Sequence, residues 1–376
     1  MRYTTPIRAT TLLAAGVLAL STTTERTLAQ GCVAVRGGGM CPLAYNDNLT
    51  PDDANLQDGD WLASAAYRWL HSHRHFVGDH EQKDRQKIGN QVINQQHFFD
   101  VGLQYAITPR YSVGVVLPFG ISDRSQTYTL GGVLNRYHTQ SSGLGDARVT
   151  GYAWLWKPTR ELKGNIQLGL GLKMPTGDDN VTDLFPSVSG GKVTWSERPV
   201  DQSIQPGDGG WGFTTEINAY RIILPRTTAY LQGFYLFNPE DTNDTLTFRG
   251  NPFESVTSIP DQYFGRVGLS YALVPKWGLS VSFGGRIEGV PVRDLLGDTS
   301  GFRRPGYAIS LEPGIEVMKG RYSFGVSIPY AIFRNRQRSV ADEAYTTLLG
   351  PGPNNYKHGD AAFADYVVTA SFSVRF

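Results

Sequence analysis

The sequence has few charged residues, only two cysteines and no long apolar run. Asp, Glu, Lys and Arg make up 18% of the 376 residues, below the roughly 25% typical of soluble domains. The formal net charge is +1, which excludes the strongly basic surface expected of a nucleic-acid-binding protein. Because no apolar stretch reaches the roughly 18 residues that a membrane-spanning helix needs, the sequence gives no signal for one.

Glycine and aromatic residues are abundant instead. The chain contains 43 glycines, and Phe, Trp and Tyr together make up 12% of it. A β-barrel that crosses a membrane needs aromatic residues at its two rims and small residues where its strands curve. Each strand of such a barrel is apolar on one face only, so a low mean hydropathy is compatible with it.

The N-terminus is typical of a secretory signal peptide. Arg2 and Arg8 flank the start of a nine-residue apolar core, LLAAGVLAL, at 12–20. Cleavage after Ala29 is one possibility and cleavage near Ser21 is another, so the exact site stays open. We therefore divide the chain into a signal peptide (1–29), an N-terminal segment (30–57) and a barrel (58–376).

The two cysteines, Cys32 and Cys41, both follow the predicted cleavage site. In an exported protein, a disulfide that closes this short loop is the favoured interpretation. Lipid attachment at Cys32 is the alternative, although Gln30 stands where a small residue is expected. The segment 30–57 either folds into the barrel lumen as a plug or extends into the periplasm as a leader.

The C-terminus carries the clearest strand pattern. Every second residue is apolar, and these residues are Tyr366, Val368, Ala370, Phe372, Val374 and Phe376. Side chains alternate between the two faces of a strand, so this period predicts one lipid-facing and one water-facing side. The terminal phenylalanine resembles the signal that the barrel-assembly machinery recognises, which we assign to Tyr366, Phe372, Val374 and Phe376.

The same alternation, clear in some segments and weaker in others, predicts a barrel of about 12 strands. Pro313 lies inside one of them and predicts a bulge. The strands are expected at 61–69, 99–107, 111–119, 146–156, 166–174, 211–223, 228–238, 262–273, 279–287, 307–317, 322–330 and 366–376.

The connections between these strands alternate strictly between short and long. Short turns are expected near Pro109, Pro158, Pro225, Pro275 and Gly320, whereas long polar loops are expected at 77–91, 120–145, 175–210, 239–261, 289–306 and 333–363. Bacterial outer-membrane barrels have short periplasmic turns and long extracellular loops. We therefore predict an all-β, antiparallel transmembrane barrel in the cell outer membrane, in contact with membrane lipid and lipopolysaccharide.

If the apolar side chains face lipid, the intervening ones line the lumen. One interpretation is a charged constriction that selects what passes, and the other is a salt-bridge network that holds the strands and blocks the lumen. The candidate constriction residues are Arg68, Asp100, Lys173, Glu216, Arg266, Arg286 and Glu288.

The histidines are the candidate metal ligands and catalytic bases of the sequence. His71, His73 and His75 alternate along an extended segment and could converge on a divalent metal, or they could belong to a polar strand extension above the membrane. His97 falls near the outer end of a lipid-facing strand, where an outer-membrane lipase would place its base. No serine motif pairs with it, so we assign no catalytic residue, metal ligand or cofactor and expect no enzyme.

Three glycine- and aspartate-rich segments resemble a known family. They are SGLGD at 142–146, LGLKMPTGD at 170–178 and QPGDG at 205–209. In order, they look like the markers of the outer-membrane transporter family named for the meta-pathway of phenol degradation. The segments FRRPGY at 302–307 and EPG at 312–314 resemble an uncharacterised subgroup of it. The resemblance covers roughly residues 60–376.

The resemblance implies a barrel that lets small, often hydrophobic or aromatic, compounds through, and it transfers no catalytic residue. Its marker segments sit at strand ends, where glycine allows tight bends and Asp146 or Asp178 can cap loop amides. We therefore predict passive passage of an unidentified small solute. A non-conducting structural or surface-display barrel is the alternative, followed by an outer-membrane lipid hydrolase.

Overall fold

The computed structural model describes residues 56–130, 132–158, 162–189 and 192–376. The predicted signal peptide, the pairing of Cys32 with Cys41 and nearly all of the segment 30–57 lie outside these residues. Those three interpretations stay predictions.

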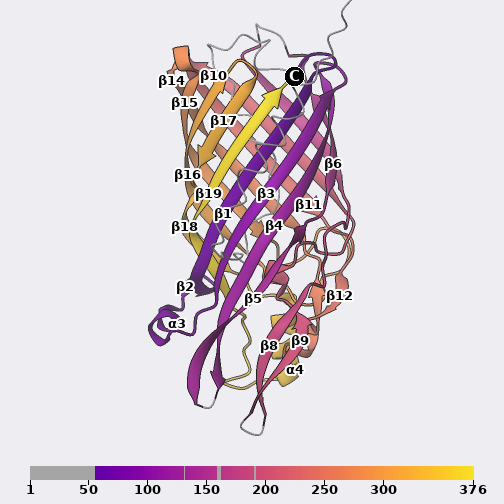
Figure 1. Ribbon diagram of the computed structural model, residues 1–376, viewed down its shortest axis with the longest axis vertical. Helices are drawn as coiled ribbons and strands as arrows, with labels where there is room; N and C mark the ends of the chain where they lie inside the picture. The colour runs from indigo at the N-terminus through magenta and orange to yellow at the C-terminus, as the bar shows by residue number, and fades with distance from the viewer. Residues whose placement is uncertain (1–55, 131, 159–161, 190–191) are drawn as a thin grey trace, which may run out of the picture.

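The described chain forms a closed antiparallel β-barrel of 12 strands (Figure 1). Its sheet closes where the first strand, β1 (Trp61–Val77), pairs with the last, β19 (Ala361–Arg375). At that seam the Trp61 amide donates to the Phe376 carbonyl (2.8 Å) and the Phe376 amide donates back to the Trp61 carbonyl (2.9 Å). Closure leaves no unpaired sheet edge, which is the condition for a sheet to cross hydrocarbon.

Each remaining barrel strand pairs with its neighbours in chain order, and two of the twelve are split into halves. β5 with β6 forms one split strand, and β17 with β18 forms the other. The segments are β3 (Ile93–Ala106), β4 (Tyr111–Leu130), β5 (Val133–Leu144), β6 (Arg148–Trp154), β7 (Gly164–Lys173), β10 (Gly212–Leu224), β11 (Thr227–Phe237), β14 (Gln262–Val274), β15 (Leu279–Val290), β16 (Gly306–Lys319), β17 (Tyr322–Ser327) and β18 (Tyr330–Arg336).

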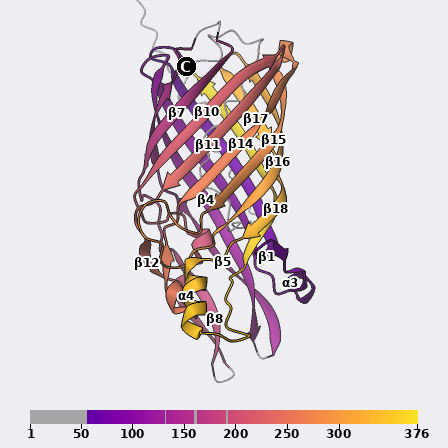
Figure 2. The ribbon, with the colours of Figure 1, turned by 180° about the vertical axis from the view of Figure 1, so that it is seen from behind.

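Short turns gather at one end of the barrel and long connections at the other, as Figures 1 and 2 show. The C-terminus lies at the short-turn end (Figure 1). We call the opposite end the loop end, and in bacterial barrels this end faces the outside of the cell. The predicted alternation of short and long connections is therefore confirmed.

The two faces of each strand differ as the period of two predicts. On the outer face, large apolar side chains are exposed, among them Leu170 (72%), Val267 (58%) and Phe283 (58%). On the inner face, polar side chains and glycines are buried. An exposed apolar belt on this scale needs lipid around it, because soluble monomers rarely leave such an area in water.

Aromatic side chains border this belt at both ends. At the short-turn end, the rings of Trp61 and Tyr105 lie 4.7 Å apart, measured between centroids. Toward the loop end, Trp69 contacts Tyr366 (5.8 Å) and Tyr235 contacts Phe237 (4.5 Å). Rings of this kind favour the interface between hydrocarbon and headgroups, so the two rims mark the height of the membrane.

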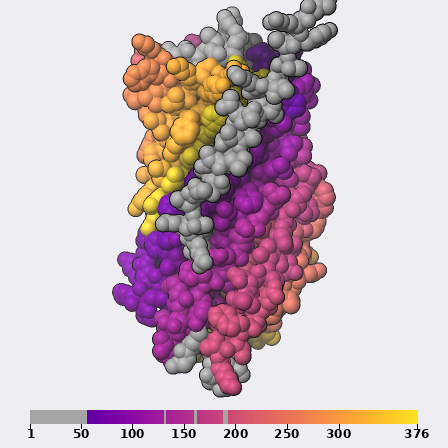
Figure 3. Space-filling model, in the orientation of Figure 1, coloured from indigo at the N-terminus to yellow at the C-terminus, as the bar shows by residue number. Residues whose placement is uncertain are grey.

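The long connections contain more regular structure than the sequence indicated. The segment 120–145, expected to be a loop, continues β4 and β5 as a hairpin beyond the barrel, because the ladder from Phe119–Leu144 to Leu130–Val133 is uninterrupted. This hairpin projects beyond the barrel at the loop end (Figure 1 and Figure 3). The other elements are β2 (His80–Glu81), α3 (Lys83–Ile88), β8 (Thr182–Ser189), β9 (Lys192–Pro199), η1 (Gln202–Ile204), β12 (Thr242–Leu246), η2 (Pro252–Glu254), β13 (Val256–Ser258), η3 (Pro275–Trp277) and α4 (Val340–Leu349).

Within the described ranges, no helix is long and apolar enough to cross a membrane.

Pro313 does not bulge β16 against β15, because the register of that pair is continuous through the Phe283–Pro313 position. The irregularity lies on the other side. There β16 changes partner from β18 to β17, and the Ile328 amide donates to the Pro313 carbonyl (3.0 Å). Pro313 and Pro329 both lack the amide hydrogen that a continuous ladder would use, which explains why the strand opposite is split.

The lipid-facing belt makes a direct prediction about Leu170. Arginine at this position would place a charge on the exposed face of β7, and we expect Leu170→Arg to lower the free energy of unfolding by about 2–4 kcal/mol in lipid vesicles. Leu184→Arg is the matched control, because Leu184 is also exposed (54%) but lies on the β8–β9 hairpin beyond the barrel. Urea-induced unfolding measures both, and equal losses for the two variants would contradict the assignment of the belt.

Candidate functional site: the lumen and its cap

Three cavities follow one another along the inside of the barrel. The first lies at the loop end (about 130 Å³), the second in the middle (about 100 Å³) and the third at the short-turn end (about 210 Å³). A cavity needs roughly 10–15 Å³ on this measure to hold one water molecule, so each is large enough for several. We refer to them as the outer, middle and inner cavity.

The cavities meet at a small group of charged side chains. Arg148 of β6 lines all three, while Arg68 of β1 and Asp100 of β3 line both the outer and the middle cavity. Asp100 lies in electrostatic range of both arginines. We call these three residues the junction, because any path along the lumen passes them.

The middle cavity is bordered by an ion-pair network from β14, β15 and β16. Arg266 Nη1 lies 2.9 Å from Glu312 Oε1, and Arg286 contacts Glu288 (2.9 Å) and Glu312 (3.7 Å). The Arg286 guanidinium also lies over the ring of Phe264 at 4.5 Å. Stacking on a ring and pairing with carboxylates together offset part of the cost of holding these charges away from bulk water.

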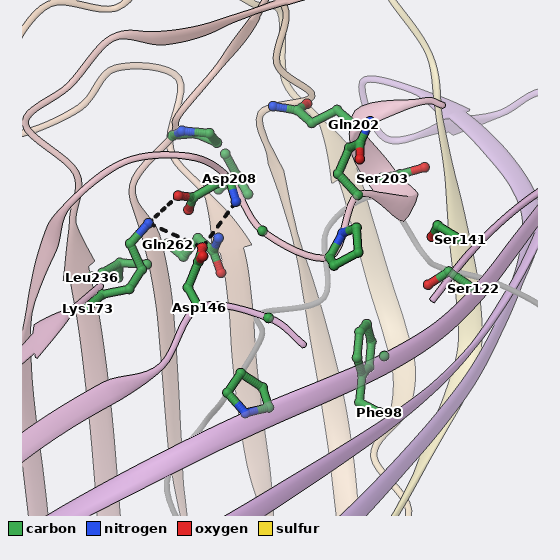
Figure 4. Close-up of a pocket in the computed structure, with 18 of the residues that line it drawn as sticks. Phe98, Ser122, Ser141, Asp146, Lys173, Gln202, Ser203, Asp208, Leu236 and Gln262 are labelled. Carbon is green, nitrogen blue, oxygen red and sulfur yellow. Dashed lines mark hydrogen bonds and ion pairs between the residues drawn. The ribbon is translucent and has the colours of Figure 1, made fainter. Parts of the chain in front are cut away.

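Lys173 lies at the wall of the outer cavity between two aspartates. Its ammonium contacts Asp208 directly and lies 3.6 Å from Asp146 Oδ2. Asp146 also accepts hydrogen bonds from the Gly177 amide (3.0 Å) and the Asp208 amide (3.0 Å). Figure 4 shows Lys173, Asp146 and Asp208 pointing toward one another.

These contacts bring the three glycine- and aspartate-rich segments together. Gly145, Gly177 and Gly207 pack so closely that a Cβ on Gly177 would lie 2.8 Å from the Gly207 Cα and 2.9 Å from the Gly145 carbonyl carbon. No side chain fits at that distance, so glycine is required for close approach of the backbones. Asp146 of the first segment accepts hydrogen bonds from amides of the second and the third segment. These contacts agree with the interpretation that the three segments serve the architecture of the barrel.

A cap covers the outer cavity. We define it as residues 201–208, which include η1, and its members Gln202, Ser203, Gln205, Pro206, Gly207 and Asp208 line that cavity. Figure 4 shows Gln202 and Ser203 above Phe98, Ser122 and Ser141 of the wall. The Ser141 hydroxyl donates to the Ile204 carbonyl, and the Gln96 side chain donates weakly to the Ser203 carbonyl (3.5 Å).

A charged latch at Asp201 holds the cap. Both oxygens of its carboxylate accept from the Arg304 guanidinium at 2.7 Å, and Arg124 lies 3.4 Å away. Burial by itself would raise the pKa of Asp201, but the two guanidinium groups lower it well below its usual range. A two-pronged arginine contact is among the strongest neutralising arrangements available to a carboxylate.

All seven predicted lumen residues point to the inside of the barrel, but they do not form one ring. Arg68 and Asp100 lie at the junction, Arg266 and Arg286 border the middle cavity, Glu216 lines the inner cavity and Lys173 the outer one. Glu288 pairs with Arg286. The sequence did not identify Arg148 as a lumen residue. Its strand also carries the aromatic residues Tyr152 and Trp154 on the lumen face, so the alternation of apolar and polar residues did not show which face points inward.

The three histidines near the loop end do not share a face. Register shifts between Leu70 and Ser72 and between Ser72 and Arg74 reorient β1, as β-bulges do. The rings of His71 and His73 are 4.8 Å apart, whereas His75 is buried against Asp360 (2.6 Å) and Val92. Across the described part of the chain, no group of three or more His, Cys, Asp or Glu side chains could hold a metal ion.

The other histidines have structural partners. His97 Nδ1 lies 2.6 Å from the Tyr67 hydroxyl, and His138 Nδ1 lies 2.9 Å from Asp123. Neither partner is a serine, so neither contact is the nucleophile–base pair that serine hydrolases use.

The closed sheet, its apolar belt and its aromatic rims define an outer-membrane β-barrel. No family model matches the chain, and no curated protein matches it in sequence. Among solved structures, it is similar to an outer-membrane channel from Pseudomonas putida F1, with 12% identity and a TM-score of 0.55 over 87% of this chain and 100% of the other. The toluene transporter TodX of P. putida matches with 9% identity and a TM-score of 0.42, over 89% and 92%. The similarity to the P. putida F1 channel supports the fold, and the resemblance to the meta-pathway family stays a prediction.

The latch predicts how the cap responds to mutation and to pH. Asp201→Asn should remove the charge that pairs with Arg304 and cost the cap about 3–5 kcal/mol, the usual loss when one partner of a buried ion pair is removed. Limited proteolysis with subtilisin should then cut within 200–210 much faster. Glu343→Gln is the control, because its partner Arg293 is exposed and the pair contributes little.

The pH dependence follows from the direction of the pKa shift. A carboxylate whose pKa is lower in the folded than in the unfolded chain stabilises the fold above its unfolded pKa, and this contribution is lost only as pH falls through the folded value. Because the pKa of Asp201 is strongly lowered, the cap should resist subtilisin equally at pH 7 and pH 5. Opening of the cap already at pH 5 would contradict the latch.

Proposed function

We propose that this protein is an outer-membrane channel for the passive passage of small molecules, with the junction as its narrowest charged point. The observation that carries the proposal is the row of three cavities, which share Arg148 and run from the cap to the short-turn end. Charged and polar side chains, together with some apolar ones, line this row, whereas the exposed apolar side chains of the strands are turned to lipid. The P. putida F1 protein of similar fold is itself an outer-membrane channel.

The candidate constriction consists of the seven predicted residues together with Arg148. Rings of mixed charge in a narrow lumen select by charge and by size. The mixture of apolar and polar lining in the outer cavity, where Phe98, Phe234 and Leu236 face Arg68 and Arg148, fits small solutes with an apolar body. We further propose that the strand ending in Tyr366, Phe372, Val374 and Phe376 is the signal for the assembly machinery.

A second function is favoured by the ion pairs of the middle cavity. Arg266 and Arg286 pair with Glu288 and Glu312, as expected of a structural network in a non-conducting barrel. The long hairpins would then serve surface display. The two functions differ in one measurable property, which is whether water and solutes cross the lumen.

Conductance decides between them. We expect the refolded mature protein (residues 30–376) in a planar bilayer to give discrete single-channel steps. A folded barrel without conductance, both with and without residues 30–57, would contradict the channel and support the structural alternative. Conductance only after the deletion would identify that segment as a plug.

Charge neutralisation tests the constriction. In a conducting barrel, the double variant Arg68→Gln/Arg286→Gln removes two positive charges from the lumen and should shift the selectivity toward cations by at least about twofold in the permeability ratio. Arg221→Gln is the control, because Arg221 lies near the short-turn end of β10 and does not line any of the three cavities. Unchanged reversal potentials in the double variant would show that the constriction lies elsewhere.

A further inference from the structure

Arg148 is the one charged side chain that lines all three cavities. It projects from the first residue of β6, directly after the split between β5 and β6, and its backbone lies between Val116 of β4 and Lys173 of β7. This position gives its guanidinium access to the point where the outer and middle cavities meet. A ligand in the lumen would therefore meet Arg148 on its way through.

The guanidinium of Arg148 has donor capacity left over. The side chain is buried, with 7% of its surface exposed, and its Nη1 donates no hydrogen bond to any residue that the structure describes. The acidic residues Asp100 and Glu216 act on it electrostatically, but no ion pair joins either of them to Arg148 in the described ranges. Leaving a buried donor without an acceptor is costly, and a bound anion would remove that cost.

Arg148 differs in this respect from Arg266 and Arg286, the lumen arginines that form ion pairs around the middle cavity. Arg266 and Arg286 already contact carboxylates at 2.9 Å, so an anion would have to displace a protein group from them. Arg148 therefore offers a terminal guanidinium nitrogen, Nη1, that no described protein group occupies, on a side chain that lines all three cavities.

The surroundings of Arg148 specify the rest of the ligand. Its guanidinium lies 5.2 Å from the centre of the Phe234 ring. Phe234 forms a buried cluster with Leu236 and Phe264, and Phe234 and Leu236 line the outer cavity with Phe98. A flat apolar group in the outer cavity would contact these side chains, and ring faces are well suited to stack on it.

We propose that Arg148 forms a subsite for a small organic monoanion, a carboxylate attached to a flat apolar body. The planar fork of arginine matches the two oxygens of a carboxylate, and the neighbouring aromatic wall accommodates the body. Asp100 and Glu216 reduce the local positive charge, which favours a monoanion over a dianion. The role of this subsite rests on the proposed function, because it would select among the solutes that pass through the channel.

The test measures binding separately from passage. The folded barrel in detergent micelles is titrated with benzoate and with its uncharged analogue benzamide, and dissociation constants are obtained by saturation-transfer NMR. We expect benzoate to bind at least about tenfold more tightly than benzamide, because a charge-assisted hydrogen bond is typically worth that factor or more. Arg148→Gln should abolish the preference, and Arg148→Lys should keep part of it.

Arg221→Gln is the matched control, since it removes the same charge from the same barrel at an exposed side chain that lines none of the three cavities. Its preference for benzoate should stay within about twofold of the native barrel. The subsite is overturned if Arg148→Gln retains the preference, or if both glutamine variants lose it equally. Heat-modifiable electrophoretic mobility confirms that each variant is folded.

The proposed function can fail independently of the subsite. Liposome swelling measures passage of the same two solutes. Benzoate that binds through Arg148 without crossing would support the subsite and contradict the channel, whereas passage of both solutes with no Arg148-dependent binding would support the channel and overturn the subsite.

Discussion

Pairing of backbone amides within a closed sheet is the constraint on which the rest of this molecule depends. Hydrocarbon offers no hydrogen-bonding partner, so every N–H and C=O in the belt must be satisfied by a neighbouring strand. The β1–β19 seam meets this condition, with a register that runs from Leu62–Arg375 to Phe76–Ala361. At the break between β5 and β6 the Gly145 amide still donates to the Pro118 carbonyl of β4 (2.8 Å), so pairing with the neighbouring strand continues there.

Closure also determines the chemistry of the interior. With the apolar side chains turned to lipid, the charged ones are forced into a narrow lumen, where a lone charge is expensive. The lumen meets this cost by pairing at Arg266 and Arg286, by stacking on Phe264 and Tyr230, and by the enclosure of Lys173 between two aspartates. Arg148 forms no ion pair with the described residues, and its Nη1 finds no acceptor among them, so we infer a place for a ligand there.

Much of the barrel could be predicted from the sequence, because a period of two reports the two faces of a strand directly. All twelve strands and the inward direction of Arg68, Asp100 and Glu216 follow from that period. The period could not show that Arg148 faces the lumen, because Tyr152 and Trp154 place aromatic residues on the lumen face of the same strand. It also failed at 120–145, where polar residues form a hairpin above the membrane rather than a loop.

The cap could not be predicted, for a different physical reason. Its latch joins Asp201 to Arg304, 103 residues apart in sequence, and no local pattern indicates such a contact. The glycine- and aspartate-rich segments were recognisable as strand ends, but their mutual packing at Gly145, Gly177 and Gly207 depends on three loops meeting in space. Long-range contacts of this kind determine whether the barrel is open or covered.

The central claim is that a cap held at Asp201 covers the outer cavity of the lumen. Accessibility of a thiol just beneath the cap tests it most directly. Ser122, which lines the outer cavity, is replaced by cysteine after Cys32 and Cys41 have been changed to serine, and a membrane-impermeant methanethiosulfonate reagent is added from the loop end. We expect slow labelling with the native latch and labelling at least about tenfold faster with Asp201→Asn, since weakening a closed state by 1.4 kcal/mol already raises the open population tenfold. Equal rates in the two backgrounds would contradict the claim.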